Sequence, residues 1–144
     1  MKIKLKTLIT VSIMALIVVI STISNAASVG MSLSSNSKLK AGDTVTVTMS
    51  LGNIDAGNGI DTITAELNYD KNVFETVETS NLIASNSWTP TYASSTNMLT
   101  VLKNSKVTKG ETVLTITLKV KSTLSVKSTT VTLKDIVVSG GRVQ

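Results

Sequence analysis

The chain has 144 residues, with 14 Lys and Arg against 9 Asp and Glu and a formal net charge of +5. It contains no Cys and no His, which excludes disulfide bonds and both Ser-His-Asp and Cys-His catalysis, and all but excludes a zinc site. The sequence shows no basic stripe with interleaved aromatic residues, so we expect no nucleic-acid partner.

Residues 1–26 are typical of a secretory signal peptide. A basic start with three Lys is followed by an apolar run from Leu8 to Ile23 and by small residues that end at Ala26. A retained membrane anchor is the alternative, but the run is short for a span and the small-residue site follows it directly. We therefore predict cleavage after Ala26. Residues 27–144 would then form one secreted, extracellular domain without a membrane span, either free or associated with the cell surface.

Three segments alternate strictly between apolar and polar residues, at 43–51, 62–69 and 114–121. A period of two puts the apolar side chains on one face of a β-strand and the polar ones on the other. Each segment is therefore predicted to be a strand with one buried and one solvated side, as in antiparallel sheets. Weaker strands are predicted at 29–34, 73–78, 97–102 and 128–138.

The last of these strands changes its alternation partway. Val131 and Leu133 share one phase, whereas Ile136 and Val138 share the other. One extra residue in a strand resets the alternation, so we predict a β-bulge near Lys134-Asp135.

Residues 79–96 show no clear alternation and are rich in Ser, Asn and Thr. We predict a long loop there, with one irregular strand near Trp88 to Tyr92. The sequence shows no amphipathic helix of useful length. Short strands separated by turns predict an all-β chain that folds as an antiparallel β-sandwich.

A corner between two predicted strands contains Tyr69 and Phe74, two of the four aromatic residues. Tyr69 is in phase with the buried side of its strand, so its ring should lie in the core and its hydroxyl should reach a polar partner near the edge. Asp70 can accept backbone N–H groups in the turn. Phe74 should return to the core on the next strand, and we interpret the corner as structural.

Three segments, taken in order, carry a resemblance to a known family. They are Gly59-Ile60 with the strand and turn up to Glu75, the run VTVTMSLGN at 45–53, and the segment 109–121, in which a Lys-Gly-Glu turn leads into a strand that ends in Lys-Val-Lys. From about residue 29 to residue 140 the chain resembles the cohesin domains, the receptor modules of cellulosome scaffolding proteins.

The resemblance implies a jelly-roll β-sandwich of nine strands, related in fold to carbohydrate-binding modules. It implies a non-catalytic module that binds a dockerin-type partner in extracellular polysaccharide degradation, with calcium carried by the partner and no cofactor or metal of its own. The outward side of the third strand is part of the family's contact face, and here those positions are Thr62, Thr64 and Glu66. Cohesins of cellulose degraders tend to carry Asn and Asp at the first two positions. Two hydroxyls offer fewer and weaker hydrogen bonds.

The chain departs from the family pattern at its C-terminal end. After Val131 to Ser139 it continues only with GGRVQ, where a cohesin would have a closing strand beside the first one. Two readings stay open: the sequence is a fragment, or the domain lacks the last strand and leaves an open sheet edge. An open edge can add a strand from another chain, which gives an alternative function as a self-assembling structural surface protein.

Trp88 and Tyr92 support another alternative, a carbohydrate-binding module. Aromatic rings of such modules stack on sugars, and the partner would then be a polysaccharide. The structural interpretation of the two rings is a loop folded onto the edge of the sandwich.

Two sets of oxygen-bearing side chains have a chemical and a structural interpretation. Asn53, Asp55, Asn58 and Asp61 surround two glycines and could bind calcium, but their spacing does not match the EF-hand pattern, and we interpret them as a glycine-rich turn with side-chain hydrogen bonds. Glu66, Glu75 and Glu78 could supply a glycosidase pair, but so small a domain leaves little room for a cleft. We therefore predict that the chain is not an enzyme.

Overall fold

The computed structural model describes residues 8–11, 20–22, 27–35, 38–55, 57–122 and 128–140, with side chains at 40–55, 57–122 and 129–140. In these ranges the chain is almost entirely β-strand, with one short 3-10 turn. The elements are β1 (Leu8–Val11), β2 (Ile20–Thr22), β3 (Ala27–Ser35), β4 (Lys38–Lys40), β5 (Thr44–Asp55), β6 (Ile60–Asn68), η1 (Thr79–Asn81), β7 (Leu82–Ala84), β8 (Thr89–Ala93), β9 (Met98–Val107), β10 (Thr112–Lys119), β11 (Ser128–Thr129) and β12 (Thr132–Ser139).

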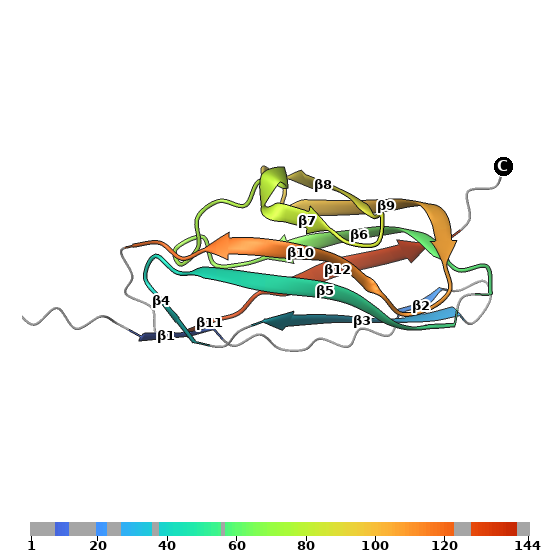
Figure 1. Ribbon diagram of the computed structural model, residues 1–144, viewed down its shortest axis with the longest axis horizontal. Coiled ribbons are helices and arrows are strands. Elements are labelled where there is room, and N and C mark those ends of the chain that lie inside the picture. Colours follow the sequence, from blue (N-terminus) through green and yellow to red (C-terminus); the bar gives the residue numbers. More distant parts are fainter. Residues whose placement is uncertain are drawn as a thin grey trace, which may run out of the picture.

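Two antiparallel sheets form the sandwich, and Figure 1 shows them as two layers whose strands run along the long axis. One sheet has the order β2-β3-β5-β10-β7, and the other has the order β12-β6-β9-β8. A small third sheet, β11-β1-β4, lies at one end of the molecule. The predicted all-β sandwich is confirmed.

The core fills the space between the two sheets and uses the apolar positions of the alternating segments. Val47 on β5, Ile116 on β10 and Ile63 and Leu67 on β6 are fully buried. Burying one such side chain contributes about 1.5–3 kcal/mol. The residues between them, such as Thr46, remain exposed or half-buried, so the predicted inward and outward faces are confirmed.

The corner after β6 is held as predicted. The buried Tyr69 hydroxyl accepts a hydrogen bond from the Val77 N–H at 3.0 Å. The Asn72 N–H donates to Asp70 Oδ1 at 2.8 Å. The Phe74 ring is fully buried and meets the Tyr69 ring edge-on, with centroids 6.5 Å apart and planes at 63°.

The prediction of a strand at 73–78 is wrong. Within that segment only Phe74 pairs with another strand, through an isolated bridge to Val120. The N–H groups of Val73 and Phe74 instead donate to the Asp70 carbonyl, at 3.0 and 2.9 Å. The Glu75 N–H donates to the Lys119 carbonyl and the Lys121 N–H to the Val73 carbonyl, each at 2.8 Å. The Val77 N–H donates to the Tyr69 hydroxyl instead, so the pairing stays an isolated bridge and no regular ladder forms.

The loop predicted at 79–96 is more regular than expected. It contains η1, β7 and β8, and the irregular strand expected near Trp88 corresponds to β8. β7 pairs with β10 in one sheet and β8 pairs with β9 in the other, so the segment crosses between the layers. Asn86 and Ser87 make this crossing with positive φ angles of 51° and 63°.

The predicted signal peptide overlaps β1 and β2, and the rest of residues 1–26 lies outside the described residues. β2 is an edge strand beside β3, whereas β1 is the central strand of the small third sheet. Cleavage after Ala26 would therefore leave the pairing of β3, β5, β10 and β7 intact, and it stays a prediction. The residues after Gly140, where a cohesin would continue into its closing strand, also lie outside the described ranges. Among the described residues, no helix has the length and hydrophobicity needed to cross a membrane.

Candidate functional site

The three predicted contact residues lie in a row on the outer side of β6. Thr62, Thr64 and Glu66 are half-buried and alternate with fully buried core residues. The register of β6 with β12 and β9, and of β9 with β8, identifies their neighbours. We call the outward side of this sheet the β6 face, made of Thr132, Lys134, Val137 and Ser139 on β12, Thr62, Thr64, Glu66 and Asn68 on β6, Met98, Thr100 and Leu102 on β9, and Thr89, Thr91 and Ala93 on β8.

The two threonine hydroxyls make hydrogen bonds within the domain. Thr62 Oγ1 donates to Asp61 Oδ1 at 2.9 Å, and Asp61 is only 9% exposed. Thr64 Oγ1 makes a longer contact of 3.5 Å with the Val137 carbonyl on β12. A hydroxyl has one proton and two lone pairs, so Thr62 can offer a partner only acceptor sites once its proton is used.

Apolar side chains flank this polar row, and the sequence analysis did not include them among the candidate contact residues. Leu102 lies opposite Thr62 and Met98 lies opposite Glu66 on β9. Val137 lies opposite Thr64 on β12 and is 59% exposed. Their outward phase on the strands was the available signal, but their position beside the threonines depends on the cross-strand register.

The predicted β-bulge in β12 is confirmed, and it shapes the β6 face. Lys134 pairs with Glu66 and Val137 pairs with Thr64, so β12 advances three residues where β6 advances two. Asp135 lies in the bulge with a φ of 48°. The extra residue keeps both Lys134 and Val137 on the outward side of the sheet.

The charges on the β6 face balance. Within the set of residues that defines it, Glu66 is the acidic side chain and Lys134 the basic one, and the two are register partners. The face therefore presents apolar groups and hydroxyls without a dominant charge of either sign.

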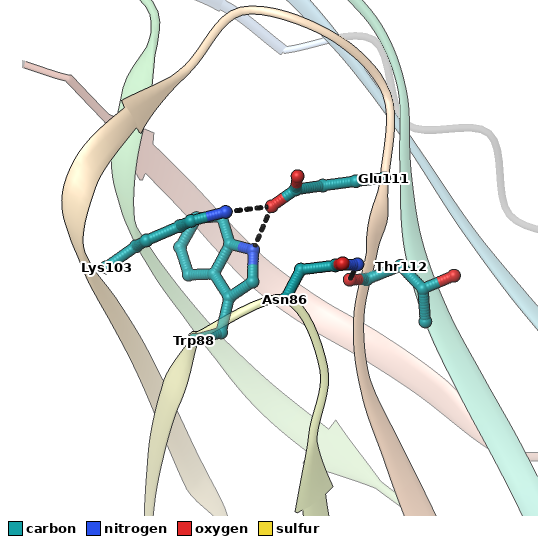
Figure 2. A network of polar contacts seen from close by, with 5 residues as sticks. All are labelled: Asn86, Trp88, Lys103, Glu111 and Thr112. Carbon is teal, nitrogen blue, oxygen red and sulfur yellow. Dashed lines mark hydrogen bonds and ion pairs between the residues drawn. The ribbon is translucent and has the colours of Figure 1, made fainter.

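Trp88, a predicted glycan-binding residue, is buried at the end of the sandwich. Its side chain is only 2% exposed. Figure 2 shows that its indole N–H and the Lys103 ammonium group both reach the same oxygen of Glu111, each at 2.6 Å. The Lys103 ammonium also lies 5.6 Å from the centre of the indole ring. These contacts join β8 and β9 of one sheet to the segment before β10 of the other, so Trp88 connects the two layers.

Tyr92, the other predicted glycan-binding residue, is also buried, at 7% exposure. Its hydroxyl donates to Asn97 Oδ1 at 3.1 Å. A ring that stacks on a sugar needs one open face, and neither Trp88 nor Tyr92 provides one. Their burial corresponds to the structural interpretation, a segment folded onto the sandwich, and gives no support to a sugar-stacking pair.

The environment of Tyr92 predicts a pH dependence of stability. Burial, and then the neighbouring Tyr69, raise the pKa of Tyr92 well above its ordinary value of 10.0. Above about pH 10 the unfolded chain releases this proton while the folded chain keeps it, so the free energy of unfolding falls as pH rises. Replacement of Tyr92 by phenylalanine tests this pH dependence, because the variant has no phenol to titrate. We expect its urea-unfolding free energy to fall less steeply than that of the wild type between about pH 9 and 12. For each protein, the change in unfolding free energy is measured relative to its own value at pH 8. Parallel curves of unfolding free energy against pH for the wild type and Tyr92→Phe would contradict a raised pKa at Tyr92.

The four oxygen-bearing residues near Gly57 and Gly59 differ in exposure. Asn53, Asp55 and Asn58 are exposed, whereas Asp61 is turned inward toward Thr62. In the part of the chain that the structure describes, no three or more acidic, His or Cys side chains form a group that could hold a metal ion.

Glu66 and Glu75, two of the three glutamates considered for a glycosidase pair, have separate environments, whereas Glu66 and Glu78 both lie close enough to Tyr92 to raise its pKa. Glu66 lies on the β6 face, whereas Glu75 is 3.9 Å from Lys119 on β10 in the other sheet. The Glu78 N–H donates to Asn81 Oδ1 beside η1. Glu66 and Glu75 therefore belong to different layers of the sandwich, which does not suit a glycosidase pair.

Comparisons with known proteins agree with this architecture. The family model described as "Cohesin domain" matches residues 29–143. The seventh ScaB type I cohesin from Pseudobacteroides cellulosolvens is 20% identical, with 59% of this chain and 60% of that chain covered and a TM-score of 0.47. This chain therefore spans less than two thirds of that structure. A CaDoc0917–CaCohA2 complex gives 15% identity over 69% of this chain and 78% of that chain, with a TM-score of 0.53. A search of curated proteins finds no match.

Proposed function

Since the chain belongs to the cohesin domain family, whose model matches residues 29–143, we propose that it is a secreted, non-catalytic receptor that binds a dockerin-type module through the β6 face. The family match is the observation that carries this proposal. A similar fold occurs in a complex that contains CaDoc0917 and CaCohA2, which supports a dockerin as the partner. We place the complex in extracellular polysaccharide degradation, with calcium bound by the partner.

The composition of the β6 face supports its assignment as the contact surface. Protein interfaces combine buried apolar contacts with a smaller number of direct hydrogen bonds. On the β6 face, Leu102, Met98 and Val137 surround the Thr62–Thr64 pair. Among the described side chains on the outward side of the five-stranded sheet, threonine and serine dominate β5 and β10, and Ile83 on β7 is the large exposed apolar one.

A pull-down tests the proposed function. The chain is produced from residues 1–144 in an exporting host, immobilised, and exposed to the calcium-replete secretome of its source organism. We expect retention of a protein that contains duplicated calcium-loop helices and its release by EDTA. N-terminal sequencing of the exported chain tests cleavage after Ala26 in the same preparation.

Other outcomes of this experiment separate the alternative functions. Retention of the chain itself on a polysaccharide, with no protein captured, would favour a carbohydrate-binding module. Concentration-dependent oligomers in sedimentation would favour assembly through a sheet edge. Either result without a captured partner contradicts the dockerin-receptor proposal.

Simultaneous replacement of Thr62 and Thr64 by alanine is expected to weaken partner binding about thirtyfold, since two hydrogen bonds of about 1 kcal/mol each are lost. Thr62→Ala also removes the hydroxyl that donates to the buried Asp61, so a loss of stability of about 1 kcal/mol should accompany it. The double serine variant keeps both hydroxyls and serves as the control. Isothermal titration calorimetry measures the affinity, and equal affinities of the alanine and serine variants would remove these hydroxyls from the contact.

A further inference from the structure

We propose that Val137 is the apolar anchor of the β6 face and that this face selects a partner surface in which aliphatic side chains flank hydrogen-bond donors. The inference rests on the proposed function, because it takes the occupant to be a dockerin-type module. It adds a specificity-determining residue and the chemistry that this residue selects.

The first step concerns the orientation of Val137. Without the bulge at Asp135, Val137 would share the phase of Leu133, which is buried at 3% exposure. The bulge instead turns Val137 outward to 59% exposure and leaves the next residue, Val138, buried at 5%. Val138 therefore packs in the core, whereas Val137 does not. An exposed aliphatic side chain beside the threonine pair suits contact with a partner.

The second step concerns hydrogen-bond polarity. The Thr62 proton is given to the Asp61 carboxylate, which can only accept. Glu66 is likewise an acceptor when ionised. Within the row of Thr62, Thr64 and Glu66, the first and last residues thus present acceptors. A partner that faces this row with its own acceptors would leave polar groups unpaired, so donors are selected.

The third step concerns charge. Glu66 and Lys134 are register partners of opposite sign, so the β6 face has no net charge within its defining residues. Contacts between surface charges weaken as salt rises, whereas burial of apolar groups does not depend on charge. We therefore expect the affinity to change little with salt, less than about threefold between 0.05 and 0.5 M NaCl.

A matched pair of substitutions tests the role of Val137. Val137 and Ile83 are both 59% exposed but lie on opposite sheets. The probe is the dockerin-type module captured by the wild-type chain, expressed alone and titrated in calcium. Val137→Asp is expected to weaken binding at least tenfold, because a carboxylate would be buried without a partner, whereas Ile83→Asp should change it less than about twofold.

Two further variants keep the test decisive. Val137→Thr preserves the shape of the side chain and should weaken binding less than Val137→Asp, in a protein whose thermal unfolding matches the wild type. Thr62→Val removes the acceptor while Thr62→Ser keeps it, so only the valine variant should lose affinity.

If the wild type binds the module but Val137→Asp, folded as judged by circular dichroism, binds equally well, Val137 is not the anchor of the β6 face and the receptor function stands. If the wild type captures no dockerin-type module, the function and this inference both fail.

Discussion

Replacement of Glu111 by alanine is expected to lower the free energy of unfolding by about 2–4 kcal/mol. The Glu111 side chain accepts from the Trp88 indole and from Lys103 at one oxygen, and the side chains of Lys103 and Glu111 are only 12% and 25% exposed. Alanine would leave the buried indole N–H without its acceptor and the ammonium group without its counter-charge. Removing one member of a largely buried ion pair costs more than the pair contributes, because the remaining charge stays desolvated.

Companion variants separate the two contributions of Glu111. Glu111→Gln keeps an acceptor for the indole and should cost less than alanine. Lys103→Met combined with Glu111→Ala removes the unpaired charge and should recover part of the loss. Chemical denaturation followed by fluorescence is suited to the measurement, since Trp88 is the only tryptophan in the chain. A loss below about 0.5 kcal/mol for Glu111→Ala would show that the network is energetically unimportant.

Replacement of Phe74 by alanine should have an effect at least as large, about 3–5 kcal/mol, because it opens a cavity in the core. Phe74 is among the largest fully buried side chains, and it makes the edge-on contact with Tyr69. Phe74→Leu keeps most of the volume and should cost clearly less. Urea unfolding measures both values. A cost for alanine no greater than that for leucine would mean that the ring does not fill the corner as described.

The Trp88–Lys103–Glu111 network and the Tyr69–Phe74 pair both hold strands of the β6 face in place. Tyr69 and Phe74 follow the end of β6. Lys103 lies on β9, and Trp88 directly precedes β8. A face held by buried contacts at both ends needs little ordering when a partner binds. Less ordering means a smaller entropic cost of association.

The local sequence pattern correctly predicted the features that depend on neighbouring residues. The alternation in 62–69 placed Ile63 and Leu67 inside and the proposed contact residues on the outward side, which is where the structure has them. The phase change after Leu133 predicted the bulge at Asp135. The strand predicted at 73–78 failed because the Val77 N–H donates to the Tyr69 hydroxyl, so the pairing that the Glu75 N–H makes with the Lys119 carbonyl does not continue.

What the sequence determined by itself is the all-β sandwich and the inward or outward direction of the residues in the three alternating segments, since a pleated strand alternates with a period of two whatever it pairs with. The tertiary structure alone decided which outward residues become neighbours. Val137 lies beside Thr64 across 73 positions of sequence, and only the register of β12 with β6 brings them together. It also decided the burial of Trp88, because the acceptor for its indole comes from the other sheet, 23 residues away. Cross-strand register and coverage by a second layer arise from long-range pairing, which a local pattern does not contain.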